Sequence, residues 1–177
     1  MILFETEKAI LFFLNQFLGQ KIWLDNLFIF FADGLIFLIF ALVLFKAVKE
    51  KEKTIFLRQV LVGLVLVLFF YYLLSQICPR LRPFRVIPAL YFKQTAFSFL
   101  DESSFPSLHT AISFFFAFFS LTKWRNFGML ILAMAILSSV SRVAIGFHWF
   151  SDIAGGVCLA YITAAILRNY KNKELQK

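Results

Sequence analysis

The chain has 177 residues, of which 61% are hydrophobic and only 16% charged, with 26 Phe and a mean hydropathy of +0.82. A soluble domain of this length needs far more polar surface, so the composition excludes one and indicates a membrane protein. The net charge of +8 does not indicate nucleic-acid binding, because the basic residues lie between apolar segments and no nucleic-acid-binding motif is present. The length predicts a single domain, residues 1–177.

Apolar segments follow one another along the chain, and about 20 apolar residues are needed to span a bilayer. Residues 4–18 are too short and too charged at their start, which favours an interfacial helix over a span. The remaining segments predict five transmembrane helices, at 26–45, 55–77, 105–122, 126–142 and 149–167. We therefore expect an all-α, polytopic membrane helix bundle with five spans and an N-terminal interfacial helix, or six spans if residues 4–18 also cross.

The basic residues predict the orientation of this bundle, since Lys and Arg accumulate on the cytoplasmic side. Eleven of the 18 follow the first, third or fifth predicted span, which places those connections and the C-terminus in the cytoplasm. The segment 78–104 then lies outside. Its prolines at 79, 83 and 88 exclude a continuous helix, and its apolar side chains favour a path along the outer membrane surface.

Three polar clusters fall on this predicted outer side. They are the arginines Arg80, Arg82 and Arg85, the stretch FPSLHT at 105–110, and the stretch SRVAIGFHWFSD at 141–152. The two histidines of the chain both belong to these clusters. Ionisable groups at membrane depth cost a few kcal/mol each, which makes these residues candidates for function.

The residue types in the clusters indicate phosphate chemistry. His148 and Asp152 are four residues apart, which puts both on one face of a helix. The Asp152 carboxylate can then accept the proton on one imidazole nitrogen and leave the other as a base or nucleophile. Pro106 suits a first helical turn, and Ser107, backbone N–H groups and His109 can converge on an anion. Arginine forks bind phosphate through paired hydrogen bonds, so the clusters together predict a phosphate site.

Other interpretations fit part of this pattern. His109, His148 and Asp152 could supply zinc ligands, although the neighbouring arginines would repel a cation. A non-enzymatic lipid-phosphate transporter is a second alternative, but a transporter places polar groups near the bilayer midplane and is built from two matching halves. This sequence shows neither feature. A protein that binds a lipid phosphate without hydrolysing it is the third alternative.

The three clusters resemble the three-part signature of the type-2 phosphatidic acid phosphatase family, which comprises a Lys/Arg-Pro motif, Pro-Ser-x-His, and Ser-Arg-x5-His-x3-Asp. Here they read RLRPF (80–84), PSLH (106–109) and SRVAIGFHWFSD (141–152), in the order and spacing of the family. The resemblance covers nearly the whole chain. It is greatest to the bacitracin-resistance type of undecaprenyl pyrophosphate phosphatase, and extends to lipid A 1-phosphatases and phosphatidylglycerophosphate phosphatases.

The resemblance implies a hydrolase without metal or cofactor that acts on a lipid phosphate or pyrophosphate, with undecaprenyl pyrophosphate as the expected substrate. It implies a place in the bacterial inner membrane with the site facing the periplasm. His148, oriented by Asp152, would attack phosphorus and form a phosphohistidine. His109 would protonate the leaving oxygen and then activate water. The implied phosphate-binding residues are Arg80, Arg82, Ser107, Leu108, Ser141 and Arg142.

The sequence departs from the family at two positions. Leu108 stands where the family often has Gly, which we expect to be tolerated because only the backbone N–H is needed. The family lysine that precedes the arginine of the first motif is absent, since Ser75 occupies its place. We expect Arg80, or otherwise Arg85 or Lys93, to replace its charge.

Three acidic residues remain outside this interpretation. Asp33 is expected to be buried against a helix partner. Asp101 and Glu102 precede the second motif, and we expect them to cap the following helix or to pair with a loop arginine.

Overall fold

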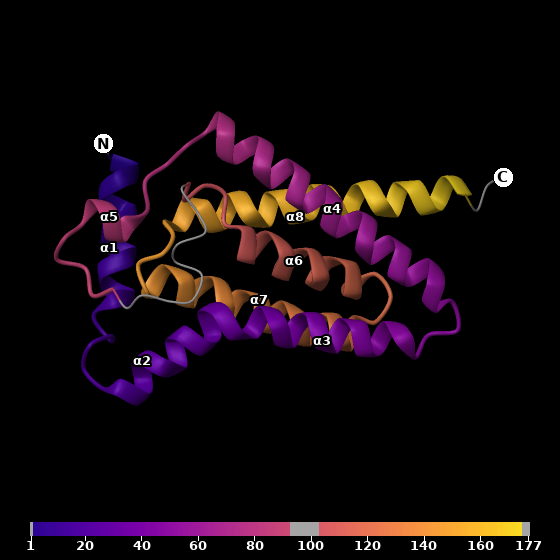
Figure 1. The fold of residues 1–177 in the computed structure, drawn as a ribbon, viewed down its shortest axis with the longest axis horizontal. Coiled ribbons are helices and arrows are strands. Elements are labelled where there is room, and N and C mark those ends of the chain that lie inside the picture. The colour runs from indigo at the N-terminus through magenta and orange to yellow at the C-terminus, as the bar shows by residue number, and fades with distance from the viewer. Residues whose placement is uncertain (1, 93–102, 175–177) are drawn as a thin grey trace.

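The computed structural model describes residues 2–92 and 103–174, and its regular elements in this part of the chain are all helices. In chain order they are α1 (Ile2–Asn15), α2 (Ile22–Ile29), the π-helical turn η1 (Phe30–Gly34), α3 (Leu35–Val48), α4 (Lys53–Ile77), α5 (Pro83–Val86), α6 (Leu108–Leu121), α7 (Arg125–Ala144) and α8 (Phe150–Glu174). Most of them run along the long axis of the molecule (Figure 1). The predicted all-α helix bundle is confirmed.

Four helices are long and apolar enough to cross a membrane. They are Ile22–Val48, which joins α2, η1 and α3, together with Lys53–Ile77, Arg125–Ala144 and Phe150–Arg168. Only 22–50% of each apolar window is buried inside the protein, so the remaining apolar surface requires lipid. The chain is therefore a multi-pass membrane protein.

The third predicted span, 105–122, is shorter in the structure than in the prediction. Helix α6 has 14 residues, which gives it a length of about 21 Å, against a hydrocarbon core of about 30 Å. It begins only at Leu108 because Pro106 and the N-cap residue Ser107 precede it, and the Ser107 side chain accepts a hydrogen bond from the Thr110 N–H. Four helices of spanning length thus replace the five that the sequence predicted.

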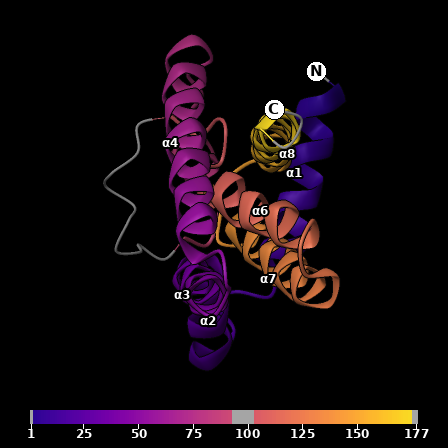
Figure 2. The same cartoon turned by 90° about the vertical axis from the view of Figure 1, so that its right-hand side faces the viewer.

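Helix α6 nevertheless forms the centre of the bundle. It packs most extensively against α7 and α8 and also contacts α3 and α4, and Figure 2 shows it between its neighbours. Its Phe115 and Phe116 are fully buried in the largest hydrophobic core cluster. Because α6 is surrounded by other helices, its start is fixed relative to both α7 and α8.

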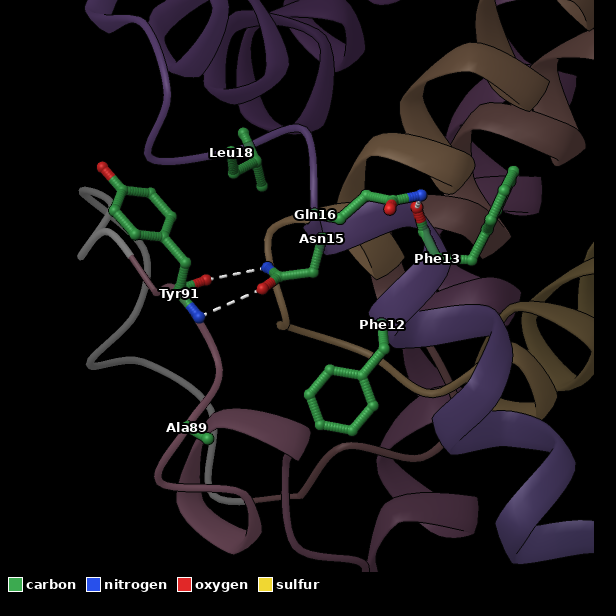
Figure 3. A pocket seen from close by; sticks show the side chains of 7 residues that line it. All are labelled: Phe12, Phe13, Asn15, Gln16, Leu18, Ala89 and Tyr91. Atoms are coloured by element: carbon green, nitrogen blue, oxygen red, sulfur yellow. Dashed lines mark hydrogen bonds between the residues drawn. The ribbon is translucent and has the colours of Figure 1, made fainter.

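Helix α1 lies across one end of the bundle, where α5 and the starts of α6 and α8 also lie, as expected for the interfacial helix at 4–18 (Figure 1). The α3–α4 and α6–α7 connections and the C-terminus lie at the opposite end. The Asn15 side chain donates hydrogen bonds of 2.8 Å to the carbonyls of Tyr91 and Ala144 and accepts one of 3.0 Å from the Tyr91 N–H (Figure 3). These bonds fasten the end of α1 to the turn after α5 and to the end of α7.

A pocket of about 530 Å³ lies beside Asn15, and Figure 3 shows the side chains that line it. Its lining comes from the second half of α1 and from the turn after α5, and comprises Phe12, Phe13, Asn15, Gln16, Leu18, Ala89 and Tyr91. None of these residues belongs to the three polar motifs.

Candidate active site

Two glycines allow the polar motifs to meet at the end of the bundle that carries α1. Gly146, in the turn between α7 and α8, has a φ of +77°, and a Cβ there would lie 2.3 Å from Leu90 Cδ2. Gly156 lets the start of α6 approach α8, since its Cβ would lie 2.7 Å from the Ser107 carbonyl oxygen. The Ser107 N–H donates to the Asp152 carbonyl at 3.0 Å. The second and third motifs are thereby joined through the backbone.

His148 lies at the centre of this region and is almost completely buried. Its Nδ1 is 2.9 Å from the Ser104 carbonyl oxygen and 3.6 Å from Asp152 Oδ2. A carbonyl can only accept, so Nδ1 must carry the proton. Its Nε2 is 3.3 Å from Arg82 Nη1 and must accept, because a guanidinium can only donate. The lone pair of His148 therefore points at an arginine.

The surroundings of His148 keep its imidazole neutral. Burial, followed by the positive charges of Arg142 and Arg82, lowers the pKa of His148 from 6.5 to about 4, against the opposing effect of Asp152. A neutral imidazole at physiological pH retains the Nε2 lone pair that a nucleophile requires.

The Asp152 carboxylate is completely buried and held from three directions. Its Oδ2 accepts a 2.8 Å bond from the Trp149 N–H and a bond from the Ser104 hydroxyl, and its Oδ1 accepts from Arg80 Nη1 at 3.0 Å. Ser104 thus contacts both members of the pair, because its hydroxyl binds Asp152 while its carbonyl binds His148. The predicted pairing of His148 with Asp152 is present, with Ser104 as the closer partner of the imidazole.

Arg82 belongs to the first motif and is completely buried against the third. Its Nη1 donates to the Phe147 carbonyl and its Nη2 to the Ser103 carbonyl, each at 3.0 Å. Its guanidinium carbon lies 4.5 Å from the centre of the Phe147 ring, and that of Arg142 lies 4.6 Å from the same centre. Two buried cations therefore share one aromatic ring beside His148.

Arg142 is paired with an acid from the first long helix. Its Nη1 donates to Asp33 Oδ1 at 2.5 Å and to the Ala32 carbonyl at 3.4 Å. Asp33 belongs to the π-helical turn η1, where the wider turn interrupts the regular α-helical pattern, as is frequent at functional sites. The expected burial of Asp33 is thus explained by a buried ion pair with a site residue.

Arg80 lies beside Asp152 and is held by two carboxylates. Its Nη1 donates to Asp152 Oδ1 at 3.0 Å and to the Ser151 hydroxyl at 2.5 Å, while its Nη2 donates to Glu7 Oε2 at 2.6 Å. The guanidinium is thus engaged by two carboxylates. In this structure Arg80 contacts Asp152, the neighbour of His148, and its replacement of the family lysine's charge stays a prediction.

The second motif supplies the start of α6. The Ser107 hydroxyl is the helix cap and also accepts from the Thr110 hydroxyl at 3.0 Å, and Leu108 is the first helical residue. His109 lies within electrostatic range of His148, Arg82 and Arg142. Helix N-termini favour anions, so this motif brings the N–H groups of a helix start and the His109 imidazole close to the two buried arginines.

Ser141 completes the set of predicted phosphate-binding residues. Its hydroxyl is buried on α7, next in sequence to Arg142, and forms no hydrogen bond within the described part of the chain. A buried hydroxyl without a partner is costly, which is consistent with a ligand that satisfies it.

The zinc interpretation receives no support from the described residues. Within 2–92 and 103–174, no three His, Cys, Asp or Glu side chains are grouped so that they could hold a metal ion. Two buried arginines close to His148 would oppose a cation there.

Sequence reasoning missed two residues of the site. Glu7 was counted only as a charge that opposes membrane spanning, and Ser104 contributes through its backbone as much as through its side chain, which no motif reveals. Three predictions, for Lys93, Asp101 and Glu102, concern residues outside those that the structure describes. Of the other predicted substitutes for the lysine, Arg85 is exposed and lies near the Phe84 ring.

Comparison with known proteins places this geometry in a family. A family model described as the PAP2 superfamily matches residues 56–176. YbjG from Escherichia coli strain K12, which bears the provisional name undecaprenyl-diphosphatase, is 29% identical over 146 residues, covering 79% of this chain and 70% of YbjG.

Two solved structures have the same fold. LpxE from Aquifex aeolicus has a TM-score of 0.74 at 22% identity, over 92% of this chain and 94% of LpxE. A transmembrane PAP2-type phosphatidylglycerolphosphate phosphatase from Bacillus subtilis has a TM-score of 0.67 at 19% identity, over 96% of this chain and 86% of its own. Because the family match contains all three polar motifs, the chain belongs to the PAP2 superfamily and is a membrane phosphatase of that family.

Proposed function

We propose that this protein hydrolyses undecaprenyl pyrophosphate to undecaprenyl phosphate and inorganic phosphate through a phosphohistidine on His148. The observation that carries the mechanism is the environment of this imidazole. Its Nδ1 proton is bound by the Ser104 carbonyl, and its Nε2 lone pair faces Arg82. A phosphate held by the neighbouring arginines would therefore meet a nucleophile whose tautomer is already set.

The reaction divides into two transfers at phosphorus. In the first, His148 Nε2 attacks, the bond from phosphorus to the leaving oxygen breaks, and His109 gives that oxygen a proton. In the second, His109 takes a proton from water, the resulting oxygen attacks phosphorus, and the bond to Nε2 breaks. Arg82 and Arg142 bind the equatorial oxygens and stabilise the charge that develops on them. Ser107, Ser141 and the Leu108 N–H complete the phosphate site.

The buried ion pair between Asp33 and Arg142 shapes this phosphate site. The Asp33 carboxylate balances the charge of Arg142. This pairing is needed because an unpaired guanidinium is costly to bury. A bound phosphate brings further negative charge to the same guanidinium.

The choice of substrate and membrane face rests on two further observations. The relative YbjG, similar over most of this chain, bears a name that assigns undecaprenyl pyrophosphate as substrate. The site lies at the end of the bundle opposite the α3–α4 and α6–α7 connections and the C-terminus, and those segments together with their adjoining helix ends hold 11 of the 18 basic residues. The positive-inside rule then puts the site at the outer face of the inner membrane.

A substrate comparison tests this proposal. The purified protein is given undecaprenyl pyrophosphate, lipid A 1-phosphate or phosphatidylglycerophosphate, each with and without EDTA because no metal is assigned, and phosphate release is measured. We expect the highest kcat/KM for undecaprenyl pyrophosphate and no release by His148→Ala. A higher kcat/KM for either other lipid would contradict the substrate, and activity that disappears with EDTA would contradict the metal-free mechanism.

A further inference from the structure

Helix α1 carries a buried carboxylate that none of the three motifs contains. Glu7 is only 3% exposed, whereas the side chain of Glu5 on the same helix is 65% exposed and pairs with Lys8. Glu7 also precedes residues 56–176, which match the family model. A buried acid on an interfacial helix requires a partner that compensates its charge.

Both oxygens of Glu7 are bound by groups from the site. Oε2 accepts from Arg80 Nη2 at 2.6 Å, and Oε1 accepts from the Ser151 N–H at 3.0 Å in the first turn of α8. Burial raises the pKa of Glu7, but the hydrogen bonds from Arg80 and Ser151 outweigh it and hold that pKa below its ordinary value. Glu7 is therefore an anion that connects α1 to the start of α8.

The position of Glu7 determines how Arg80 approaches Asp152. One arm of the guanidinium, Nη2, is taken by Glu7, so only Nη1 reaches Asp152, at Oδ1. The other oxygen, Oδ2, remains on the side of His148, where it also binds Ser104 and Trp149. Without Glu7, the planar fork would be free to bind both carboxylate oxygens at once, which is the preferred geometry of an arginine–carboxylate pair.

A second attachment holds α1 independently of this ion pair. The Asn15 bonds to Tyr91 and Ala144 fix the other end of the helix (Figure 3). A change at Glu7 therefore alters the ion pair with Arg80 while Asn15 keeps α1 attached to the bundle.

We propose that Glu7 is a positioning residue for the phosphatase reaction, because it restrains Arg80 to Oδ1 of Asp152 and leaves Oδ2 to the Ser104 and Trp149 bonds that hold it beside His148. This inference rests on the proposed role of His148 as nucleophile. Glu7 touches neither phosphate nor His148 in this arrangement. Its loss should therefore slow the chemical step while leaving phosphate binding by Arg82 and Arg142 intact.

The test compares Glu7→Gln, which keeps the shape but removes the charge, with Glu5→Gln as the matched control on the same helix. In steady-state hydrolysis of a lipid phosphate, we expect kcat of Glu7→Gln to fall about tenfold while KM stays within about twofold of wild type. Glu5→Gln should match wild type in both constants. Glu7→Asp, which restores the charge on a shorter side chain, should recover part of kcat.

A double variant shows whether Glu7 acts through Arg80. We expect Arg80→Ala to lower kcat, and the addition of Glu7→Gln to cause little further loss, since the residue it restrains is gone. Independent, multiplying losses would contradict the proposal. So would an unchanged kcat in Glu7→Gln, or a rise in KM alone, which would instead make Arg80 a phosphate ligand.

Two controls separate this inference from others. Thermal unfolding in detergent shows whether each variant is folded. If Glu7→Gln is not, Glu7→Asp is compared with Glu5→Asp, and Glu7→Asp should lower kcat by less than about tenfold with KM unchanged, while Glu5→Asp should match wild type. Hydrolysis by wild type that persists in His148→Ala would refute the proposed mechanism itself. Hydrolysis that requires His148 but is indifferent to Glu7 would refute only the role of Glu7.

Discussion

Replacement of Asp33 by Asn tests the buried ion pair that holds Arg142. Asp33 Oδ1 lies 2.5 Å from Nη1 of Arg142, whose side chain is 1% exposed. The substitution keeps the shape and an acceptor oxygen but removes the negative charge. Removal of one partner from a buried ion pair costs about 3–5 kcal/mol, and the amide oxygen retains part of the hydrogen bond. We therefore expect a loss of about 3 kcal/mol in the free energy of unfolding, the lower end of that range.

Unfolding of the purified protein in detergent, with and without vanadate as a phosphate mimic, measures both consequences. Vanadate should stabilise Asp33→Asn more than wild type, because the anion then supplies the charge that Arg142 has lost. Asp25→Asn is the control. Asp25 is also buried on the same long helix, but it binds the Gly19 N–H and the Tyr91 hydroxyl, which are neutral donors. It should lose less stability and respond to vanadate like wild type.

Two results would refute this reasoning. Equal free energies of unfolding for wild type and Asp33→Asn would show that the pair contributes nothing to the folded state. Equal stabilisation of both proteins by vanadate would show that the anion does not bind at Arg142, and the phosphate site would then have to be placed on Arg82 and α6 alone.

Three further predictions concern the reaction and its orientation. The pKa of His148 is lowered to about 4, so kcat/KM, corrected for substrate protonation, should decrease as the pH falls through about 4. A decrease centred near 6.5 would show that the surroundings do not keep the imidazole neutral. His109→Ala should slow hydrolysis of a lipid monophosphate much more than that of a pyrophosphate, whose leaving oxygen has a conjugate acid with a pKa of about 6; equal losses in measured turnover would make His109 a phosphate ligand. In intact cells, an impermeant thiol reagent should label Cys78, at the site end of α4, in a Cys158→Ser variant. It should not label Lys51→Cys in a variant whose two native cysteines are both serine, and the reverse pattern would invert the topology.

The long apolar helices could be predicted from the sequence because lipid imposes a length and a composition on each span. Helix α4 begins and ends within two residues of the predicted 55–77, and α7 within two residues of 126–142. Helix α6 is shorter than the predicted 105–122, because Pro106 and the Ser107 cap delay its start, and surrounding helices as well as lipid stabilise it. The π-helical turn at Phe30–Gly34 gave no signal in the hydrophobic pattern.

The convergence of the motifs at one end of the bundle could also be predicted, since it follows from the order of the spans. The partners of the motif residues could not. The contact between His148 and the Ser104 carbonyl involves the backbone, which carries no sequence signal. The sequence shows the charge of Arg80, which led to its assignment to phosphate, but it does not show that Glu7 is buried and pairs with Arg80. Which cation pairs with which carboxylate depends on how α1 lies across the bundle, and no local pattern encodes that.

The central claim is that His148 becomes phosphorylated during turnover. The most direct measurement is rapid quench of the purified protein with a phosphate-labelled lipid substrate, followed by mapping of the label under alkaline conditions, where phosphohistidine is preserved. We expect label on His148, none in His148→Ala, and a longer-lived label in His109→Ala with a pyrophosphate substrate, because that variant lacks the base that activates water. Label on His109, or turnover without any labelled histidine, would contradict it.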